Sequence, residues 1–448
     1  MKDKLLFVPQ HMASLREMLL ISNALSNGCC IFYMTFTVSD NILSEIKSNG
    51  SEVVFVDGLL LRSVEKKKKR NEIIKFLMKL PVLSFFIDFF VMRFLTRSLH
   101  SRIEKDIVFF GELVSKYSIK KVILTTDRST GAELSIAALA TRVKLELIVI
   151  SFAISAGIDS SEKMRKSCFY YYEKNISWNS TLLPNGKIIS FFKKFEKKVI
   201  ESLGVKIDNP WVLGAGFSDC MLVDSIREKE RLVEMGGNSD KYFVVGQISH
   251  DKVFRSNINR MDVNKKVRKK YNLKRESIVL VAVPQYYEHG LCDKETHFSI
   301  INEMIEILSC LNYDVVLSLH PKMNRHNYEF IAFDKDNVVI VDEDLNEILP
   351  ICDVFVSTYS STLSWALLCS KKVIIIDHVL LGYTDFLSEY NLPVLNNNKE
   401  LYDFLTGSPF LYDSSFYSYD KDLVNKLSPF DGECVSRIAD ILRCKYDE

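Results

Sequence analysis

The sequence lacks an excess of charge of either sign, long apolar runs and paired cysteines. It has 58 Lys and Arg residues against 57 Asp and Glu, a net charge of +1, so we do not expect a dedicated nucleic-acid-binding protein. No run reaches the ~20 uninterrupted apolar residues of a membrane-spanning helix, and the first apolar run is too short for a secretory signal peptide. The ten cysteines form no C-x-x-C pair, which argues against disulfides and zinc sites and favours a reducing cytoplasm.

What is present is a globular composition of 448 residues, 47% hydrophobic and 26% charged, which suits two α/β domains of roughly 200 residues each. Apolar runs such as KKVILTTD and ESIVLVAVPQ alternate with helical stretches, which predicts two parallel, doubly wound sheets. We expect one Rossmann-like domain over 1–207, a second over 208–428, and a C-terminal helix over 429–448 that packs back on the first domain. Ligands bind at the carboxyl ends of such strands, so the substrates are expected in an interdomain cleft.

An insertion at about 62–102 interrupts the first domain. The basic cluster EKKKKR at 65–70 is followed by the Phe-rich stretch 75–95, which Lys79, Pro81, Asp88 and Arg93 interrupt. Basic residues beside a Phe-rich segment are typical of an element that lies on an anionic membrane surface, which predicts a peripheral membrane contact through 66–95. Phe residues at helical spacing are also typical of a buried helical pair, and both interpretations remain open.

Polar residues follow three predicted strands of the second domain, where each strand ends. DVVLSLHPK places His320 and Pro321 directly after a strand, and a histidine there can donate to a phosphate or to a leaving oxygen, although a lone histidine is often structural. Hydroxyl side chains after DVFVS open the next helix and could bind an anion there, although Ser and Thr are also ordinary helix caps. The substrate-binding candidates at these strand ends are Gln285, Glu288, His289, Pro321, Lys322, Ser357, Ser360, Ser361 and Thr362.

The first domain supplies carboxylates at its strand ends. In ILTTDRSTGAE, Asp127 and Glu133 are the candidates for a general base, with plain helix capping as the alternative for Asp127. Gln10 and His11 follow the first predicted strand and are further substrate-binding candidates. No cofactor is expected. No metal site is expected either, because Glu288 and His289 with His297 do not have a recognised ligand spacing.

The His-Pro pair, followed one βα unit later by STYSST, resembles the nucleotide-binding half of GT-B enzymes. This half occurs in bacterial sialyl-, polysialyl- and Kdo transferases and in CDP-glycerol-dependent polymerases. The resemblance covers about 208–393 and implies that His320, Pro321, Ser360 and Ser361 hold the phosphate of a cytidine nucleotide. It identifies 208–428 as the nucleotide-sugar-binding domain and 1–207 as the acceptor side.

The same fold occurs in UDP-N-acetylglucosamine 2-epimerases, whose strand-end Asp could correspond to Asp127. Those enzymes also carry an acidic residue before an Ala-Gly, where this sequence reads ISFAISAG without a carboxylate. A UDP-N-acetylglucosamine 2-epimerase-like enzyme is therefore less favoured than a transferase and stays an alternative, as does a non-catalytic nucleotide-binding protein of a polysaccharide export complex.

These observations predict a glycosyltransferase that moves a sugar from a nucleotide donor to a bacterial surface glycan such as a capsule, an O-antigen or a lipid-linked oligosaccharide. A CMP-sugar is favoured as the donor, and the reaction is expected to be inverting and metal-independent. Asp127 or Glu133 would deprotonate the acceptor, and His320 would stabilise the departing nucleotide. We expect the protein in the cytoplasm, at the inner face of the membrane.

Overall fold

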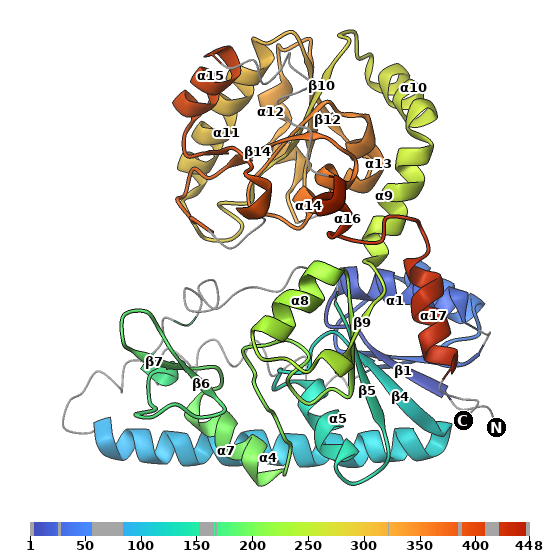
Figure 1. The fold of residues 1–448 in the computed structure, drawn as a ribbon, viewed down its shortest axis with the longest axis vertical. Coiled ribbons are helices and arrows are strands. Elements are labelled where there is room, and N and C mark those ends of the chain that lie inside the picture. Colours follow the sequence, from blue (N-terminus) through green and yellow to red (C-terminus); the bar gives the residue numbers. More distant parts are fainter. Residues whose placement is uncertain are drawn as a thin grey trace. The chain divides into compact units, whose positions relative to one another are not determined.

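The computed structural model describes residues 4–25, 28–55, 84–151, 165, 168–320, 322–383, 388–407 and 421–444 (Figure 1). The chain divides into two compact units, the first made of 1–245 with 435–448 and the second of 246–434. Each unit contains one large parallel sheet.

The first unit has a seven-stranded sheet in the order β3-β2-β1-β4-β5-β8-β9. All six pairings are parallel, and every residue of β2 is buried, as is typical of a parallel sheet covered on both faces. The chain runs from β1 outward to β3 and then returns to β4, which makes the β1–β4 pair the topological switch point of this sheet. The strands are β1 (Lys4–Val8), β2 (Cys30–Met34), β3 (Glu52–Phe55), β4 (Ile119–Leu124), β5 (Glu146–Ile150), β8 (Cys220–Val223) and β9 (Tyr242–Val244).

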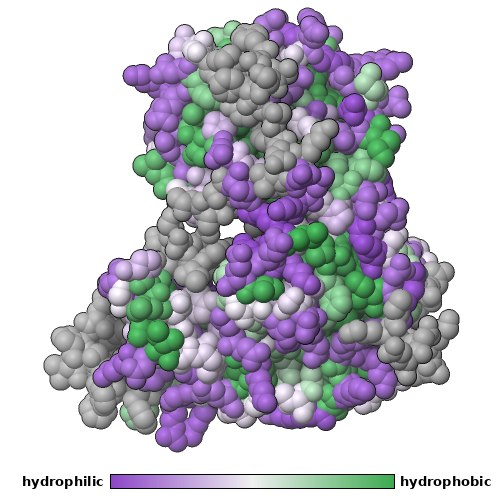
Figure 2. All heavy atoms as spheres, in the orientation of Figure 1, coloured by the Kyte–Doolittle hydropathy of each residue, from purple (hydrophilic) through white to green (hydrophobic). Residues whose placement is uncertain are grey.

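The helices of this unit connect the strands, and a small hairpin interrupts them. The hairpin is formed by the antiparallel strands β6 (Ser180–Leu182) and β7 (Ile188–Ser190). Figure 2 shows hydrophobic side chains gathered over this hairpin, where Ile176 and Leu182 are exposed. The helices are α1 (Met12–Ala24), α2 (Asp40–Ser48), α4 (Ser84–Tyr117), α5 (Ala132–Ala140), α7 (Lys194–Ser202) and α8 (Ile226–Glu234).

The boundary between the two sheets differs from the sequence prediction, which began the second domain at residue 208. Strand β8 pairs with β5, Ile148 lying opposite Cys220, and β9 pairs with β8, so both belong to the first sheet. Apolar runs of buried parallel strands look alike in either sheet, so periodicity finds the strands without assigning them to a sheet. The first unit therefore continues to Val245.

Helix α17 (Cys434–Cys444) belongs to the first unit, far from the other residues of that unit in the sequence. The Lys121 ammonium donates to the carbonyl of Leu442 at 2.9 Å, and Arg437 Nε donates to the carbonyl of Val245 at 2.8 Å. Ile438 and Leu442 are fully buried. The helix is thus held by buried apolar side chains and by hydrogen bonds to β4 and to the residue that follows β9.

Residues 62–83 of the predicted insertion lie outside the described residues, and the side chains before Phe90 are likewise not described. The rest of the insertion is the first half of α4, on which Phe90 and Phe94 are exposed. Of the helices that the structure describes, none is both long enough and apolar enough to cross a membrane.

The second unit has a six-stranded parallel sheet in the order β12-β11-β10-β13-β14-β15. Alternate residues of β10 enter different apolar clusters, Val279 and Val281 one and Ile278 and Leu280 the other, as the period of a strand requires. The switch point of this sheet is the β10–β13 pair. The strands are β10 (Ile278–Ala282), β11 (Asp314–Ser318), β12 (Val338–Val341), β13 (Val354–Ser357), β14 (Lys372–Ile376) and β15 (Val394–Leu395).

The α-helices of the second unit range from four to sixteen residues. They are α9 (Ile248–Ile258), α10 (Arg260–Tyr271), α11 (Lys294–Ser309), α12 (Glu329–Ala332), α13 (Leu345–Ile348), α14 (Thr362–Leu368), α15 (Asn398–Gly407) and α16 (Lys421–Asn425).

Candidate functional site

Three adjacent strands of the second unit end in the three polar segments that the sequence singled out. Strand β10 lies between β11 and β13, and its carboxyl end leads into the segment that contains Gln285, Glu288 and His289. His320 follows β11, and the hydroxyl run, Ser360 to Thr362, follows β13. Because the strands are parallel, all three segments leave the same edge of the sheet, and they do so at its switch point.

His320 is exposed at the end of β11, and its ring has a defined tautomer. Its Nδ1 accepts a hydrogen bond from the backbone N–H of Lys322 at 3.1 Å, so in the neutral ring Nε2 carries the proton. Partial desolvation, then the charges of Lys322 and His289, lower the pKa of His320, and Glu288 opposes this shift. The lowered pKa therefore favours a neutral imidazole at pH 7, with its proton on Nε2. Pro321 lies outside the described residues.

Glu288 is held by Tyr328, whose hydroxyl is in turn hydrogen-bonded to His297. The Tyr328 hydroxyl donates to Glu288 Oε1 at 3.0 Å and lies 2.8 Å from Nε2 of the buried His297, which therefore donates to it. This series of hydrogen bonds, from His297 through Tyr328 to Glu288, gives His297 a structural role. In the described part of the chain, Glu288 Oε2 and Gln285 Oε1 are buried without a hydrogen-bond partner, and His289 is exposed beside them in the sequence.

The hydroxyl run divides into capping and non-capping side chains. Ser360 Oγ accepts from the backbone N–H of Thr362 at 3.3 Å and from its Oγ1 at 3.0 Å, so Ser360 acts as a cap. Ser361 stands at the N-cap position of α14 without a side-chain capping bond, and Ser357 is buried in β13. Helix α14 is only seven residues long, so its dipole adds little to an anion site.

A fourth strand end carries polar groups that the sequence analysis missed. His378 follows β14, and its Nδ1 lies 3.2 Å from the hydroxyl of Tyr286, while its Nε2 lies 2.7 Å from Asn398 Oδ1. The neighbouring Asp377 accepts the backbone N–H groups of Leu381 and Gly382, both at 2.8 Å. The strand-end rule applied to the run VIIIDH could have found both residues.

The switch point of the first unit brings two predicted residues together. Gln10, after β1, donates to Glu133 Oε1 at 2.6 Å, and Ser129, after β4, donates to Glu133 Oε2 at 2.9 Å. A Cβ at Gly131 would lie 2.8 Å from Glu133 Oε2, so the glycine leaves room for this arrangement. His11 caps α1 by accepting the Ser14 N–H at Nδ1. Glu133 is thus a buried carboxylate oriented by two neutral donors.

Asp127 does not fit the role of a general base. It is 0% exposed, and its carboxylate accepts the N–H of Gly216 at 2.8 Å, the hydroxyl of Ser218 at 2.8 Å and the N–H of Gly214 at 3.3 Å. A Cβ at Gly216 would lie 2.0 Å from the Asp127 carbonyl oxygen. The fully buried carboxylate is therefore an internal anchor for the loop 212–218.

No cluster of three or more metal-binding side chains occurs among the residues that the structure describes. The strand-end candidates thus separate into two groups, one at each switch point, with Asp127 outside both.

Two parallel, doubly wound sheets with polar groups at their switch points define the GT-B fold, and solved structures share it over nearly the whole chain. The UDP-N-acetylglucosamine 2-epimerase from Neisseria meningitidis, bound to UDP-GlcNAc, matches with a TM-score of 0.52 and 11% identity over 99% of both chains. A putative UDP-N-acetylglucosamine 2-epimerase from Listeria monocytogenes matches with a TM-score of 0.52 and 13% identity over 100% of this chain and 97% of that one. The glycotransferase of kitacinnamycin matches with a TM-score of 0.54 and 10% identity over 99% and 98%. At these identities the likeness concerns the fold.

Residues 222–408 match the family model of CDP-Glycerol:Poly(glycerophosphate) glycerophosphotransferase. The match contains all three polar segments after β10, β11 and β13. No curated protein sequence matches the chain. These comparisons support a transferase of GT-B fold.

Proposed function

We propose that this transferase uses a cytidine nucleotide as the activated donor and a hydroxyl of a bacterial surface glycan or lipid-linked acceptor. The observation that carries the proposal is the placement of His320, Lys322 and His289 at the ends of the neighbouring strands β11 and β10. A neutral imidazole donor and an ammonium suit a phosphate that gains charge as its bond breaks. These residues lie within the stretch that matches the family model, whose description supports a cytidine donor.

Two donor types fit this site, and both release the same nucleotide. With a CMP-sugar, the acceptor oxygen forms a bond to the anomeric carbon while the bond to the CMP phosphate breaks. With CDP-glycerol, the acceptor oxygen forms a bond to the glycerol-bearing phosphorus and the bond to CMP breaks. In either case the acceptor loses a proton and the electron pair leaves with CMP. The strand-end motif favours the CMP-sugar, and the family description favours CDP-glycerol.

Glu133 is the carboxylate that we assign as general base. Its oxygens accept from Gln10 and Ser129, which are neutral, so the carboxylate is oriented without an ion pair to these partners. A single displacement with this base would invert the configuration of a transferred sugar. The charge that develops on CMP would be stabilised by side chains of the second unit, in a metal-independent reaction.

A thermal-shift comparison of CMP, CDP, UDP and GDP tests the donor class. A nucleotide that binds the folded state raises the apparent stability by about 2.7 kcal/mol at a concentration of 100 Kd. We expect CMP and CDP to raise the midpoint of unfolding more than UDP or GDP. A larger shift with UDP would contradict the cytidine assignment and favour a uridine nucleotide.

The catalytic role of the site is tested by the rate of CMP release from CDP-glycerol and from CMP-sialic acid, each with a surface-glycan acceptor. His320→Ala is expected to lower the rate on the order of a hundredfold. The matched control is His326→Ala, because His326 is an exposed histidine of the same unit outside the three polar segments. Unchanged turnover in His320→Ala would exclude His320 from the reaction. Conversion of UDP-N-acetylglucosamine without an acceptor would instead favour the epimerase, and nucleotide binding without turnover the non-catalytic protein.

A further inference from the structure

A cavity in the first unit lies outside the residues used above. Its volume is about 360 Å³, and it is lined by 176–181, which leads into β6, by 208–212 and by Met235. The sequence has three tryptophans, and two of them, Trp178 and Trp211, line this cavity. Figure 2 shows hydrophobic surface over the hairpin. Ile176, one of the residues that line the cavity, is exposed.

The lining combines flat apolar rings with small polar groups. Hydroxyl, amide and carboxylate side chains come from Ser177, Ser180, Thr181, Asn209 and Asp208. Among the lining residues only Asp208 is charged, and no Lys, Arg or His takes part. The Arg165 guanidinium lies over the Trp211 ring, 5.3 Å from its centroid, but is not among the lining residues. Within the lining, the Asp208 charge disfavours the phosphate of a nucleotide and the carboxylate of an acidic sugar. A neutral ring with one apolar face and several hydroxyls matches the lining.

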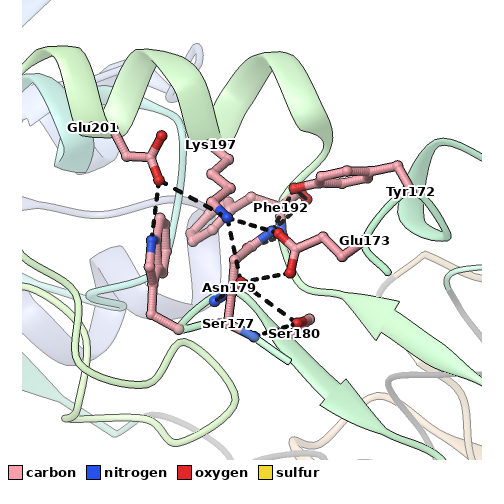
Figure 3. Close-up of polar contacts among 9 residues, drawn as sticks. Tyr172, Glu173, Ser177, Asn179, Ser180, Phe192, Lys197 and Glu201 are labelled. Atoms are coloured by element: carbon pink, nitrogen blue, oxygen red, sulfur yellow. Dashed lines mark hydrogen bonds and ion pairs between the residues drawn. The ribbon is translucent and has the colours of Figure 1, made fainter. Parts of the chain in front are cut away.

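Trp178 is held in position by a polar network behind the cavity. Its Nε1 donates to Glu201 at 3.2 Å, and Lys197 lies over its ring with the ammonium 5.7 Å from the centroid. The Lys197 ammonium is itself 2.8 Å from Glu173, so its charge is already paired, as Figure 3 shows. A ring fixed in this way binds a ligand without first losing rotational freedom.

The same network fixes the backbone that precedes β6. Ser177 donates to Glu173, and the Asn179 side chain both accepts the N–H of Phe192 at 2.8 Å and donates to its carbonyl at 3.0 Å (Figure 3). Asn179 is fully buried. The wall formed by 176–181 is therefore tied to the segment that follows β7.

The opposite wall is tied to the loop that carries the proposed base. Arg128 donates to the carbonyls of Pro210 at 3.1 Å and Trp211 at 3.0 Å, and Asn209 Oδ1 accepts the Trp211 N–H at 2.9 Å. Trp211 is 6% exposed, and its indole N–H has no hydrogen-bond partner within the described ranges. Arg128 stands next to Ser129, which orients Glu133. The segment after β4 thus contacts the cavity wall through Arg128 and the proposed base through Ser129.

We propose that this cavity binds an uncharged sugar unit of the acceptor glycan. The proposal rests on the proposed transferase function and adds an acceptor subsite to it. Trp178 and Trp211 would contact the apolar face of the sugar ring, and Asp208 and Asn209 would bind its hydroxyls. Binding there orders an acceptor chain in the unit that carries Glu133.

The test is a titration of the full-length protein with cellobiose and with N,N′-diacetylchitobiose, followed by saturation-transfer NMR and tryptophan fluorescence. Two anionic compounds, 3′-sialyllactose and glycerol 3-phosphate, are titrated in parallel. We expect binding of at least one neutral disaccharide, weakened about tenfold by Trp178→Ala and severalfold by Asp208→Ala. Trp365→Phe is the matched control, because it changes the third tryptophan and leaves the cavity intact.

Each outcome separates this proposal from the proposed function. Neutral binding that both cavity variants weaken, and that the control retains, supports the subsite. Binding that the variants leave unchanged, binding of the anionic compounds alone, or no binding of any sugar overturns it. The thermal shift with CMP is measured on every variant, so a lost sugar response with a retained CMP response reports on the cavity alone. A native protein without a CMP response contradicts the nucleotide proposal whatever the sugars do.

Discussion

Replacement of Asp127 distinguishes a structural anchor from a general base. In Asp127→Ala the N–H of Gly216 and the hydroxyl of Ser218, both 2.8 Å from the carboxylate, lose their acceptor in a buried region. Hydrogen bonds to a charged group contribute about 1.5–3 kcal/mol each, and the 3.3 Å contact with Gly214 adds less. We therefore expect the free energy of unfolding of the first unit to fall by about 3–5 kcal/mol.

Urea unfolding at pH 7, followed by tryptophan fluorescence, measures this loss, because Trp211 belongs to the segment that the neighbouring Arg128 holds. Asp127→Asn keeps one acceptor oxygen but turns an NH₂ group toward a donor, so it should fall between the native protein and Asp127→Ala. The control is Asp240→Ala at an exposed position, where the change should stay within about 0.5 kcal/mol. A variant Asp127→Asn with native stability and turnover reduced a hundredfold or more would refute the structural role and restore Asp127 as the base.

Three further predictions follow from burial and exposure. Burial lowers the pKa of His250 to about 3. As the pH falls below 6.5, the unfolded chain therefore binds a proton at this histidine before the native protein does. The native protein should thus lose about 2–3 kcal/mol of stability between pH 7 and 4.5. In chemical-denaturation curves, His250→Gln should show a smaller loss over this range, and an identical pH dependence would contradict the assignment. Glu133→Gln should lower turnover by about a hundredfold. The thermal shift induced by CMP should be retained, because Glu133 lies in the first unit and the proposed nucleotide site in the second. Native turnover in this variant would exclude Glu133 as the base. In liposome flotation with anionic vesicles, Phe90→Ser together with Phe94→Ser should weaken binding, whereas Val108→Ser on the same helix should not; absence of flotation by the native protein would remove the membrane contact.

The parts of the fold that could be predicted from the sequence are those that depend on local pattern. Buried parallel strands are apolar along their length, so runs such as CIFYM and IVLVA mark strands without any tertiary information. The expectation of two parallel α/β sheets is confirmed. The placement of β8 and β9 could not be predicted. The sequence of a buried parallel strand does not indicate which of two sheets the strand joins, so the pairing of β8 with β5 is not visible in it.

The same limit applies to the candidate site. The strand-end rule placed Gln285 after β10 and His320 after the neighbouring β11, because parallel topology alone decides where a strand end lies. The role of Asp127 depends on Gly214 and Gly216, which are remote in sequence and act through backbone N–H groups that any residue type carries. No local pattern could reveal such partners.

In the proposed reaction, proton removal and phosphate binding are assigned to different switch points, and the two tasks require opposite surroundings. A carboxylate that acts as a general base must be ionised and able to accept a proton. A departing phosphate requires cations and hydrogen-bond donors instead. A carboxylate that forms an ion pair with those cations has a lower pKa and becomes a weaker base. Glu133 is oriented by Gln10 and Ser129, which carry no charge, while Lys322 and the histidines lie on the other sheet. If Glu133 is the base and Lys322 binds the phosphate, as proposed, each group can be tuned by the neighbours within its own unit.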